Sequence, residues 1–129
     1  MNKEAYVKSE SAQRLKEKGF DWAVMTCYEN SEFRYVNLWN WNKYSAYTLY
    51  SAPTQQMARR WLREEHKIHI TTEPLEMFKQ ERIVYEPIIY LLNDFDDFAL
   101  EYKTVHLKEC DTNEDAIEAA LEFVLTKLI

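Results

Sequence analysis

Residues 20–28 read FDWAVMTCY, and this stretch indicates the fold class of the chain. Its larger side chains recur at every second position, from Phe20 through Val24 to Tyr28. A period of two is typical of a β-strand, because successive side chains point to opposite faces. Since intervening residues such as Met25 are also apolar, we expect a strand that is buried on both sides.

The same pattern predicts five further strands. They occupy residues 33–41, 44–50, 67–72, 83–92 and 98–108. Pro87 has no N–H to donate to a neighbouring strand, so the strand at residues 83–92 should be an edge strand or contain a bulge. A slip in the apolar phase of the last strand predicts a β-bulge near Lys103. Residues 93–97, NDFDD, predict the hairpin turn between the last two strands.

Gly19 is the only glycine in the chain, and it follows a predicted helix over residues 9–18. Ser9 or Ser11 is the candidate N-cap of this helix. The residue after a helix end often has a left-handed backbone conformation, which glycine adopts without strain. Phe20 would then pack back on the last turn of the helix. With no other glycine available, we expect the strand connections to avoid tight glycine-dependent turns and to be longer loops.

Two more helices complete the pattern. The second follows Pro53, which suits a first helical turn, and should end near His66. The third is capped by Thr112, with Asp115 three residues on, and apolar side chains recur at helical spacing over residues 116–128. The order α-β-β-β-α-β-β-β-α predicts an α+β fold with about three helices and a mostly antiparallel sheet. We expect a single domain over residues 1–129, with residues 1–8 frayed.

The charge of the chain is acidic and uneven. It has 16 basic and 22 acidic side chains, and residues 67–129 alone hold 6 basic and 14 acidic ones. This balance argues against a protein that binds nucleic acid through its phosphates. The acidic half is either a solvated surface or a face that meets a basic partner.

Cys27 and Cys110 are the only cysteines, and no CxxC motif is present. They fit the reducing cytoplasm, each as a small buried apolar side chain. Burial of Cys27 would raise its pKa, which is the opposite of what a nucleophile needs. No stretch is long and apolar enough to cross a membrane, and residues 1–9 do not form a signal peptide. We therefore expect a cytoplasmic protein.

His66 and His69 are close in sequence. His106 and Cys110 would join them at a metal site only if the first and last strands of the second half were neighbours. The predicted second helix ends between the first two histidines, so they do not share a helical face as in HExxH. Ordinary surface or strand histidines are the better interpretation. The sequence therefore predicts no metal, no cofactor, no small-molecule substrate and no catalytic residue.

Residues 20–50 hold ten of the 19 aromatic side chains. Part of this cluster is expected in a sheet core. An exposed part including Trp39, Trp41 and Tyr44 would suit protein contacts or the stacking of bases. In the second case a basic patch would help, formed by the arginines of the second helix: Arg59, Arg60 and Arg63.

One block is more specific than these patterns: SAPTQ at residues 51–55 followed by WLREEHKIHI at residues 61–70. With LKEKGFD at residues 15–21, it resembles a family of small uncharacterised proteins of phages and prophages of gut Bacteroidetes. The resemblance implies a phage-linked origin and no particular activity. It also implies that Arg63, Glu64, His66 and His69 are signature positions for packing or binding.

Together these observations favour a small non-enzymatic phage or prophage accessory protein that binds another protein or associates with itself. The candidate binding residues are Trp39, Trp41, Tyr44, Arg59, Arg63, His66 and His69. One alternative is a nucleic-acid-associated module that uses Trp39, Trp41 and Tyr44 with the three arginines. The other is a metal-dependent enzyme that uses His66, His69 and His106.

Overall fold

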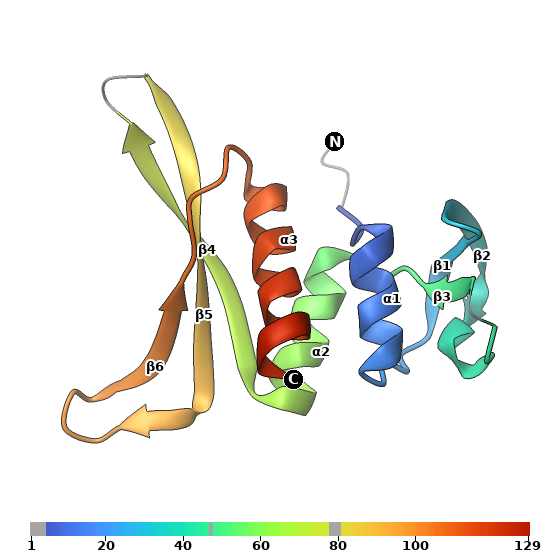
Figure 1. Cartoon of the computed structure of the whole chain (residues 1–129), viewed down its shortest axis with the longest axis horizontal. Coiled ribbons are helices and arrows are strands. Elements are labelled where there is room, and N and C mark those ends of the chain that lie inside the picture. The colour runs from blue at the N-terminus through green and yellow to red at the C-terminus, as the bar shows by residue number, and fades with distance from the viewer. Residues whose placement is uncertain (1–4, 47, 78–80) are drawn as a thin grey trace. The chain divides into compact units, whose positions relative to one another are not determined.

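The computed structural model describes residues 5–46, 48–77 and 81–129 (Figure 1). The helices and strands are α1 (Ser9–Glu17), β1 (Val24–Glu29), β2 (Glu32–Trp39), the 3₁₀ helix η1 (Trp41–Lys43), β3 (Leu49–Ser51), α2 (Gln55–His66), β4 (Ile68–Met77), β5 (Arg82–Asp96), β6 (Glu101–His106), α3 (Asn113–Phe123) and the π-helical turn η3 (Val124–Leu128). The predicted α+β class and the predicted order of helices and strands are confirmed.

The chain divides into two compact units, one formed by Met1–Ala58 with Val124–Ile129 and the other by Arg59–Phe123. The first holds an antiparallel sheet of order β2-β1-β3, and the second an antiparallel sheet of order β4-β5-β6. The expectation of a single domain stays a prediction. No helix among the described residues is long and apolar enough to span a membrane.

In the first unit, α1 ends as predicted at Gly19, whose φ is 92°. The N–H of Phe20 donates to the carbonyl of Leu15 at 2.9 Å, and the N–H of Gly19 donates to Lys16 at 3.1 Å. These two bonds form a Schellman ending, and Phe20 is buried beneath it. The predicted serine cap is wrong: Lys8 is the N-cap residue and makes no side-chain cap bond.

The first sheet differs from the prediction in where its strands begin and which sides are buried. The strand predicted from Phe20 begins only at Val24, and Met25 within it is 60% exposed, so the strand is not buried on both sides. β1 and β2 are joined by a two-residue turn with φ of 53° at Asn30 and 66° at Ser31. The expectation of longer loops is therefore wrong here, because asparagine tolerates the left-handed conformation that such a turn needs.

Residues 5–8, part of the segment expected to be frayed, are bonded to the start of α2. The N–H of Val7 donates to Pro53 at 3.0 Å, and the N–H of Gln55 donates to Ala5 at 2.8 Å. Val7 is fully buried. This pairing holds the N-terminal segment against the first unit, while residues 1–4 lie outside the described residues.

In the second unit, α3 packs against β4 and β5. The N–H of Asp115 donates to the Thr112 hydroxyl at 3.0 Å, which confirms the predicted cap. The buried face of α3 includes Ala116 and Ala120 as predicted, together with Ile117 and Leu121 beside them. The helix therefore buries a wider face than the predicted stripe.

Pro87 lies in β5, the central strand of the second sheet, so the expectation of an edge strand is wrong. The alternative expectation, a bulge, is met in β5, between Leu91 and Phe95. The carbonyl of Pro87 accepts a hydrogen bond from the N–H of Leu107 at 3.0 Å. A residue in an antiparallel strand points its N–H and C=O to the same side, here toward β6, which ends at His106 opposite Ile88. The missing N–H of Pro87 therefore removes no bond from the ladder with β4.

A bulge is present opposite Lys103, as predicted, but its extra residues belong to β5 and not to β6. Leu91 pairs with Lys103 and Phe95 pairs with Tyr102, so three residues of β5 bulge out. Because β5 continues to Asp96, the hairpin turn occupies residues 97–100 and not the predicted residues 93–97.

Candidate functional site

The aromatic side chains of residues 20–50 divide into an inner and an outer set. Tyr28 and Tyr50 belong to the inner set, with ring centroids 5.8 Å apart. The hydroxyl of Tyr28 donates to the carbonyl of Val7 at 2.7 Å, and that of Tyr50 shares a 2.7 Å hydrogen bond with the Ser9 hydroxyl. These bonds satisfy the polar ends of two largely buried rings, so the inner set stabilises the fold.

The outer set lies mainly on β2 and leaves large apolar side chains exposed. We call these residues the β2 surface: Met25, Phe33, Tyr35, Leu38 and Trp39. Tyr35 is 78% exposed and Leu38 is 62% exposed. Isolated apolar side chains at a surface are ordinary, but several together are typical of an interaction site.

A groove of about 240 Å³ opens at the β2 surface. Its lining is mostly apolar and comes from β1, β2 and the segments around them: Tyr6, Ala23, Val24, Met25, Thr26, Tyr35, Leu38, Pro53, Thr54 and Met57. Edge-to-face stacking supports one side of it, because the ring of Phe33 contacts those of Tyr6 and Tyr35 at centroid distances of 4.8 and 5.3 Å. The groove therefore has stacked aromatic side chains behind its exposed residues.

A bulge in β2 places Tyr35 and Leu38 at the same groove. Thr26 pairs with Tyr35 but Val24 pairs with Trp39, so β2 has two more residues than β1 between these pairs. Residues 35 and 38 would point to opposite faces of a regular strand. Met25, Tyr35 and Leu38 were not among the predicted binding residues, because nothing in the local sequence pattern marks this bulge.

The predicted binding residue Trp41 has a structural role. Its Nε1–H lies 3.1 Å from the carbonyl of Val24 and 3.0 Å from that of Asn37. The neighbouring Asn42 donates from Nδ2 to the carbonyl of Phe20 at 2.9 Å and accepts at Oδ1 from the N–H of Ser51 at 2.8 Å. These contacts fix η1 to β1 and β3.

Trp39 and Tyr44, by contrast, are about half exposed. The Nζ atom of Lys43 lies 5.8 Å from the ring centroid of Trp39, close enough for a cation–π contact. The ring of Tyr44 stacks obliquely on Trp41 at 6.2 Å. Of the three aromatic residues predicted to bind, Trp41 is therefore fixed by hydrogen bonds, whereas Trp39 and Tyr44 are accessible.

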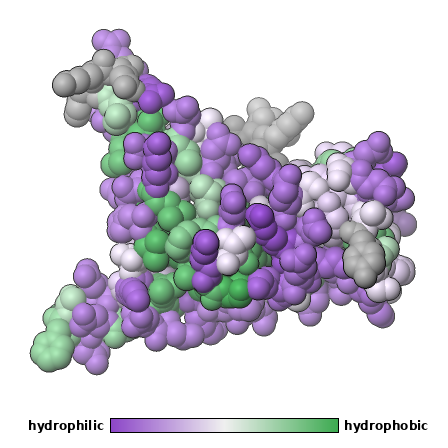
Figure 2. Space-filling model, viewed as in Figure 1, coloured by the Kyte–Doolittle hydropathy of each residue, from purple (hydrophilic) through white to green (hydrophobic). Residues whose placement is uncertain are grey.

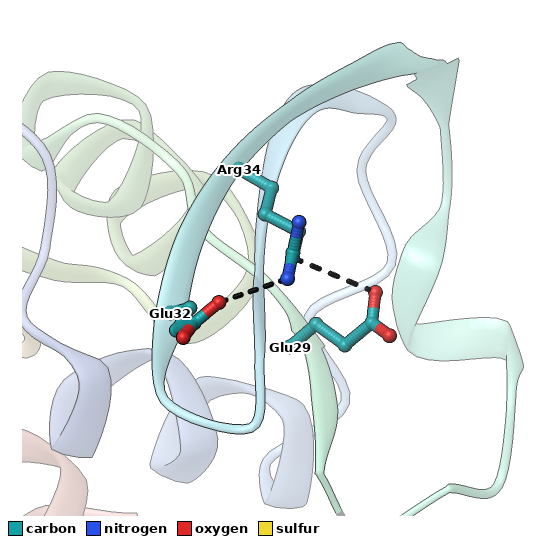
Figure 3. Close-up of polar contacts among 3 residues, drawn as sticks. All are labelled: Glu29, Glu32 and Arg34. Carbon is teal, nitrogen blue, oxygen red and sulfur yellow. Dashed lines mark hydrogen bonds and ion pairs between the residues drawn. The ribbon is translucent and has the colours of Figure 1, made fainter.

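The β1–β2 hairpin also carries a charged group, formed by Glu29, Glu32 and Arg34 (Figure 3). Because side chains alternate along β2, Glu32 and Arg34 lie on the face opposite Phe33 and Tyr35. Nη2 of Arg34 lies 2.8 Å from Glu32, and its Nε lies 3.9 Å from Glu29. All three side chains are largely exposed, so the ion pairs contribute little to stability. The two carboxylates neutralise the positive charge of Arg34. The side chains of Glu32 and Arg34 are charged, whereas those of Phe33 and Tyr35 on the opposite face of β2 are aromatic.

The arginines of the second helix do not form a simple basic patch. Nε of Arg59 donates to the carbonyl of Ile70 at 3.1 Å, and Nε of Arg60 bonds Glu64 at 3.0 Å. Burial, and then the nearby charge of Arg63, lower the pKa of Arg59. Only Arg63 of the three is exposed without an ion pair or hydrogen bond among the described residues.

The three histidines have three different partners. The ring of His66 packs edge-on to Trp61 at 4.9 Å, and that of His69 lies 6.0 Å from Tyr90. Nδ1 of His106 lies 2.7 Å from a carboxylate oxygen of Glu86. In the described part of the chain, no three His, Cys, Asp or Glu side chains group as metal ligands would.

Both cysteines are free thiols. Cys27 is buried as predicted, and burial, with a smaller effect from Glu29, raises its pKa. Cys110 is only partly buried, so the prediction of a buried side chain is wrong for it. Burial and the surrounding carboxylates raise the pKa of Cys110 as well, so both cysteines favour the unreactive thiol form.

Comparison with known proteins adds no family to these observations. No family model matches the chain, and no curated protein or solved structure was found to be similar to it.

Proposed function

We propose that this chain is a small non-enzymatic accessory protein, of phage or prophage origin, that binds another protein through the β2 surface. The observation that carries the proposal is the exposure of Met25, Tyr35 and Leu38 around one apolar groove. The phage origin rests only on the sequence resemblance, which includes residues 15–21, 51–55 and 61–70.

The energetics favour a protein ligand. Full burial of a large apolar side chain contributes about 1.5–3 kcal/mol, so covering three of them supplies a useful part of a binding free energy. Aromatic anchors next to a groove are the usual centre of such interfaces.

The outer edge of β2 offers a second source of affinity. β2 is an edge strand, and no other strand of the described chain pairs with its outer side. An extended segment of a partner could add to the sheet there and place apolar side chains in the groove. The β2 edge of a second copy of this chain could pair there in the same way, and the protein would then associate with itself.

A selection from a library of short random peptides, with the whole chain immobilised, tests the proposal. We expect apolar peptides whose affinity falls at least about tenfold in the Tyr35→Ser/Leu38→Ser double variant. Ile83→Ser is the matched control, because it removes an exposed apolar side chain from β5. Equal affinities for the wild type and the double variant would refute the role of the β2 surface.

Light scattering on the same proteins tests whether the chain associates with itself. We expect the wild type to have the mass of a dimer in that case, and the double variant to have the mass of a single chain. A dimer that the double variant leaves intact would place self-association elsewhere on the chain.

A nucleic-acid-associated module is the second candidate function. The contact of Lys43 with the exposed ring of Trp39, beside the exposed Tyr44, favours it. Such a group could stack bases and neutralise one phosphate. Binding of a fluorescent single-stranded oligonucleotide at low salt, abolished by Trp39→Ala, would support this candidate, and no binding at low salt would remove it.

A further inference from the structure

The turn between β5 and β6 forms a second apolar surface, which we call the 94–102 tip, in the second unit. Phe98 is 101% exposed and Leu100 is 76% exposed. Figure 2 shows hydrophobic side chains at this far end of the β5–β6 hairpin, at lower left, next to hydrophilic ones. Burial of these two side chains by a partner would release the water that now covers them and so favour binding.

The base of the tip is held together by a pair of rings. Phe95 and Tyr102 are directly paired across β5 and β6, and their rings meet edge to face with centroids 5.0 Å apart. Each ring remains more than one-third exposed. The apolar surface therefore continues from the turn onto the two strands.

The turn is closed by hydrogen bonds of its own. A carboxylate oxygen of Asp96 accepts from the N–H of Phe98 at 2.9 Å and from the N–H of Ala99 at 3.2 Å. The carbonyl of Asp96 accepts from the N–H of Leu100 at 2.8 Å, and Leu100 has a φ of 57°. A rigid turn presents Phe98 with little loss of conformational entropy on binding.

The charges around the tip have one sign. Four carboxylates lie within its nine residues and no basic residue does: Asp94, Asp96, Asp97 and Glu101. Asp96 is paired directly with Glu101, an arrangement in which like charges repel. None of the four forms an ion pair with another described residue.

We propose that the 94–102 tip is a docking element for a partner protein that has an apolar pocket edged by lysine and arginine side chains. Phe98 fills the pocket, and the four carboxylates pair with the basic rim. Charge decides the class of partner, because nucleic acid, an anionic membrane and the tip of a second copy would all be repelled. This surface goes beyond the proposed function, since none of its residues belongs to the β2 surface.

The test uses the whole chain and the same library of short random peptides. We expect a class of peptides that combine lysine or arginine with large apolar residues and whose affinity falls at least about tenfold in Phe98→Ser. Asp97→Lys should weaken the same peptides several-fold, and added salt should reduce the difference between Asp97→Lys and the wild type. Phe98 and Asp97 are exposed, so neither substitution should disturb folding.

Two controls keep this result separate from that of the β2 surface. Ile83→Ser and the Tyr35→Ser/Leu38→Ser double variant should bind the basic peptides as tightly as the wild type does. Basic peptides that bind Phe98→Ser with unchanged affinity, or a selection that yields no excess of lysine and arginine, would overturn the proposal. A dimer that Phe98→Ser dissociates would also overturn it, in favour of contact between two copies.

Discussion

Single residues with unusual backbone angles show how this chain makes tight turns with one glycine. Gly19 takes the left-handed conformation at the end of α1. Among the described residues, so do five others: Asn30, Ser31, Lys67, Glu81 and Leu100. A side chain in this conformation costs roughly 1–2 kcal/mol, a cost that the surrounding hydrogen bonds and packing must offset.

Gly19→Ala should therefore destabilise the protein by about 1 kcal/mol through its backbone alone. Apart from atoms of residues 18–20, no heavy atom of the described chain lies within 4 Å of where the added methyl group would be, so the substitution causes no clash with the rest of the fold. Urea unfolding followed by circular dichroism measures the change. Leu100→Gly is the control of opposite sign, because glycine relieves the strain at φ 57°. A Gly19→Ala variant as stable as the wild type would contradict this account of the helix end.

His69 should make folding stability depend on pH. Burial, then the charges of Arg63 and Arg59, lower its pKa in the folded protein. Between the lowered pKa and the ordinary one, the unfolded chain binds more protons, so the free energy of unfolding rises with pH. As pH falls from about 7 to about 5, the wild type should lose more stability than His69→Asn does. Parallel pH profiles for the two proteins would show that His69 does not contribute.

Among the helices and strands, the features that the sequence predicted correctly are those that depend on residues close together in the chain. Gly19 and Thr112 mark helix ends through contacts within a few residues, and both predictions are confirmed. Pro87 failed as a marker of an edge strand because its tolerance depends on where β6 ends, far along the chain. The turn at residues 97–100 was misplaced because the bulge in β5 shifts the pairing beyond it.

Asn42 connects η1 to β3 and to Phe20 in the segment between α1 and β1. Asn42→Ala removes two part-buried hydrogen bonds, one to the carbonyl of Phe20 and one from the N–H of Ser51. We expect a loss of about 2 kcal/mol in the free energy of unfolding. The exposed Asn37 is the matched control, and its change to alanine should have little effect. Chemical denaturation compares the two, and equal stabilities would contradict the connecting role of Asn42.

For the molecule as a whole, composition pointed to the part of the chain that carries the proposed binding surface, but not to the residues that form this surface. The density of aromatics at residues 20–50 pointed to the first sheet, yet Trp41 is anchored there and Tyr35 is exposed. Which aromatics face water follows from strand pairing and a bulge, and neither is visible in one sequence. Likewise, the prediction of a hairpin turn at residues 93–97 placed Phe98 in the following strand, whereas Phe98 is an exposed residue of the turn itself.

The central claim is that the β2 surface binds protein, and a ratio of two dissociation constants tests it most directly. Fluorescence anisotropy measures the binding of one selected apolar peptide to the wild type and to the Tyr35→Ser/Leu38→Ser variant, with Ile83→Ser alongside. The account predicts at least about a tenfold weaker affinity for the double variant and an unchanged affinity for Ile83→Ser. Equal affinity for the wild type and the double variant would contradict it.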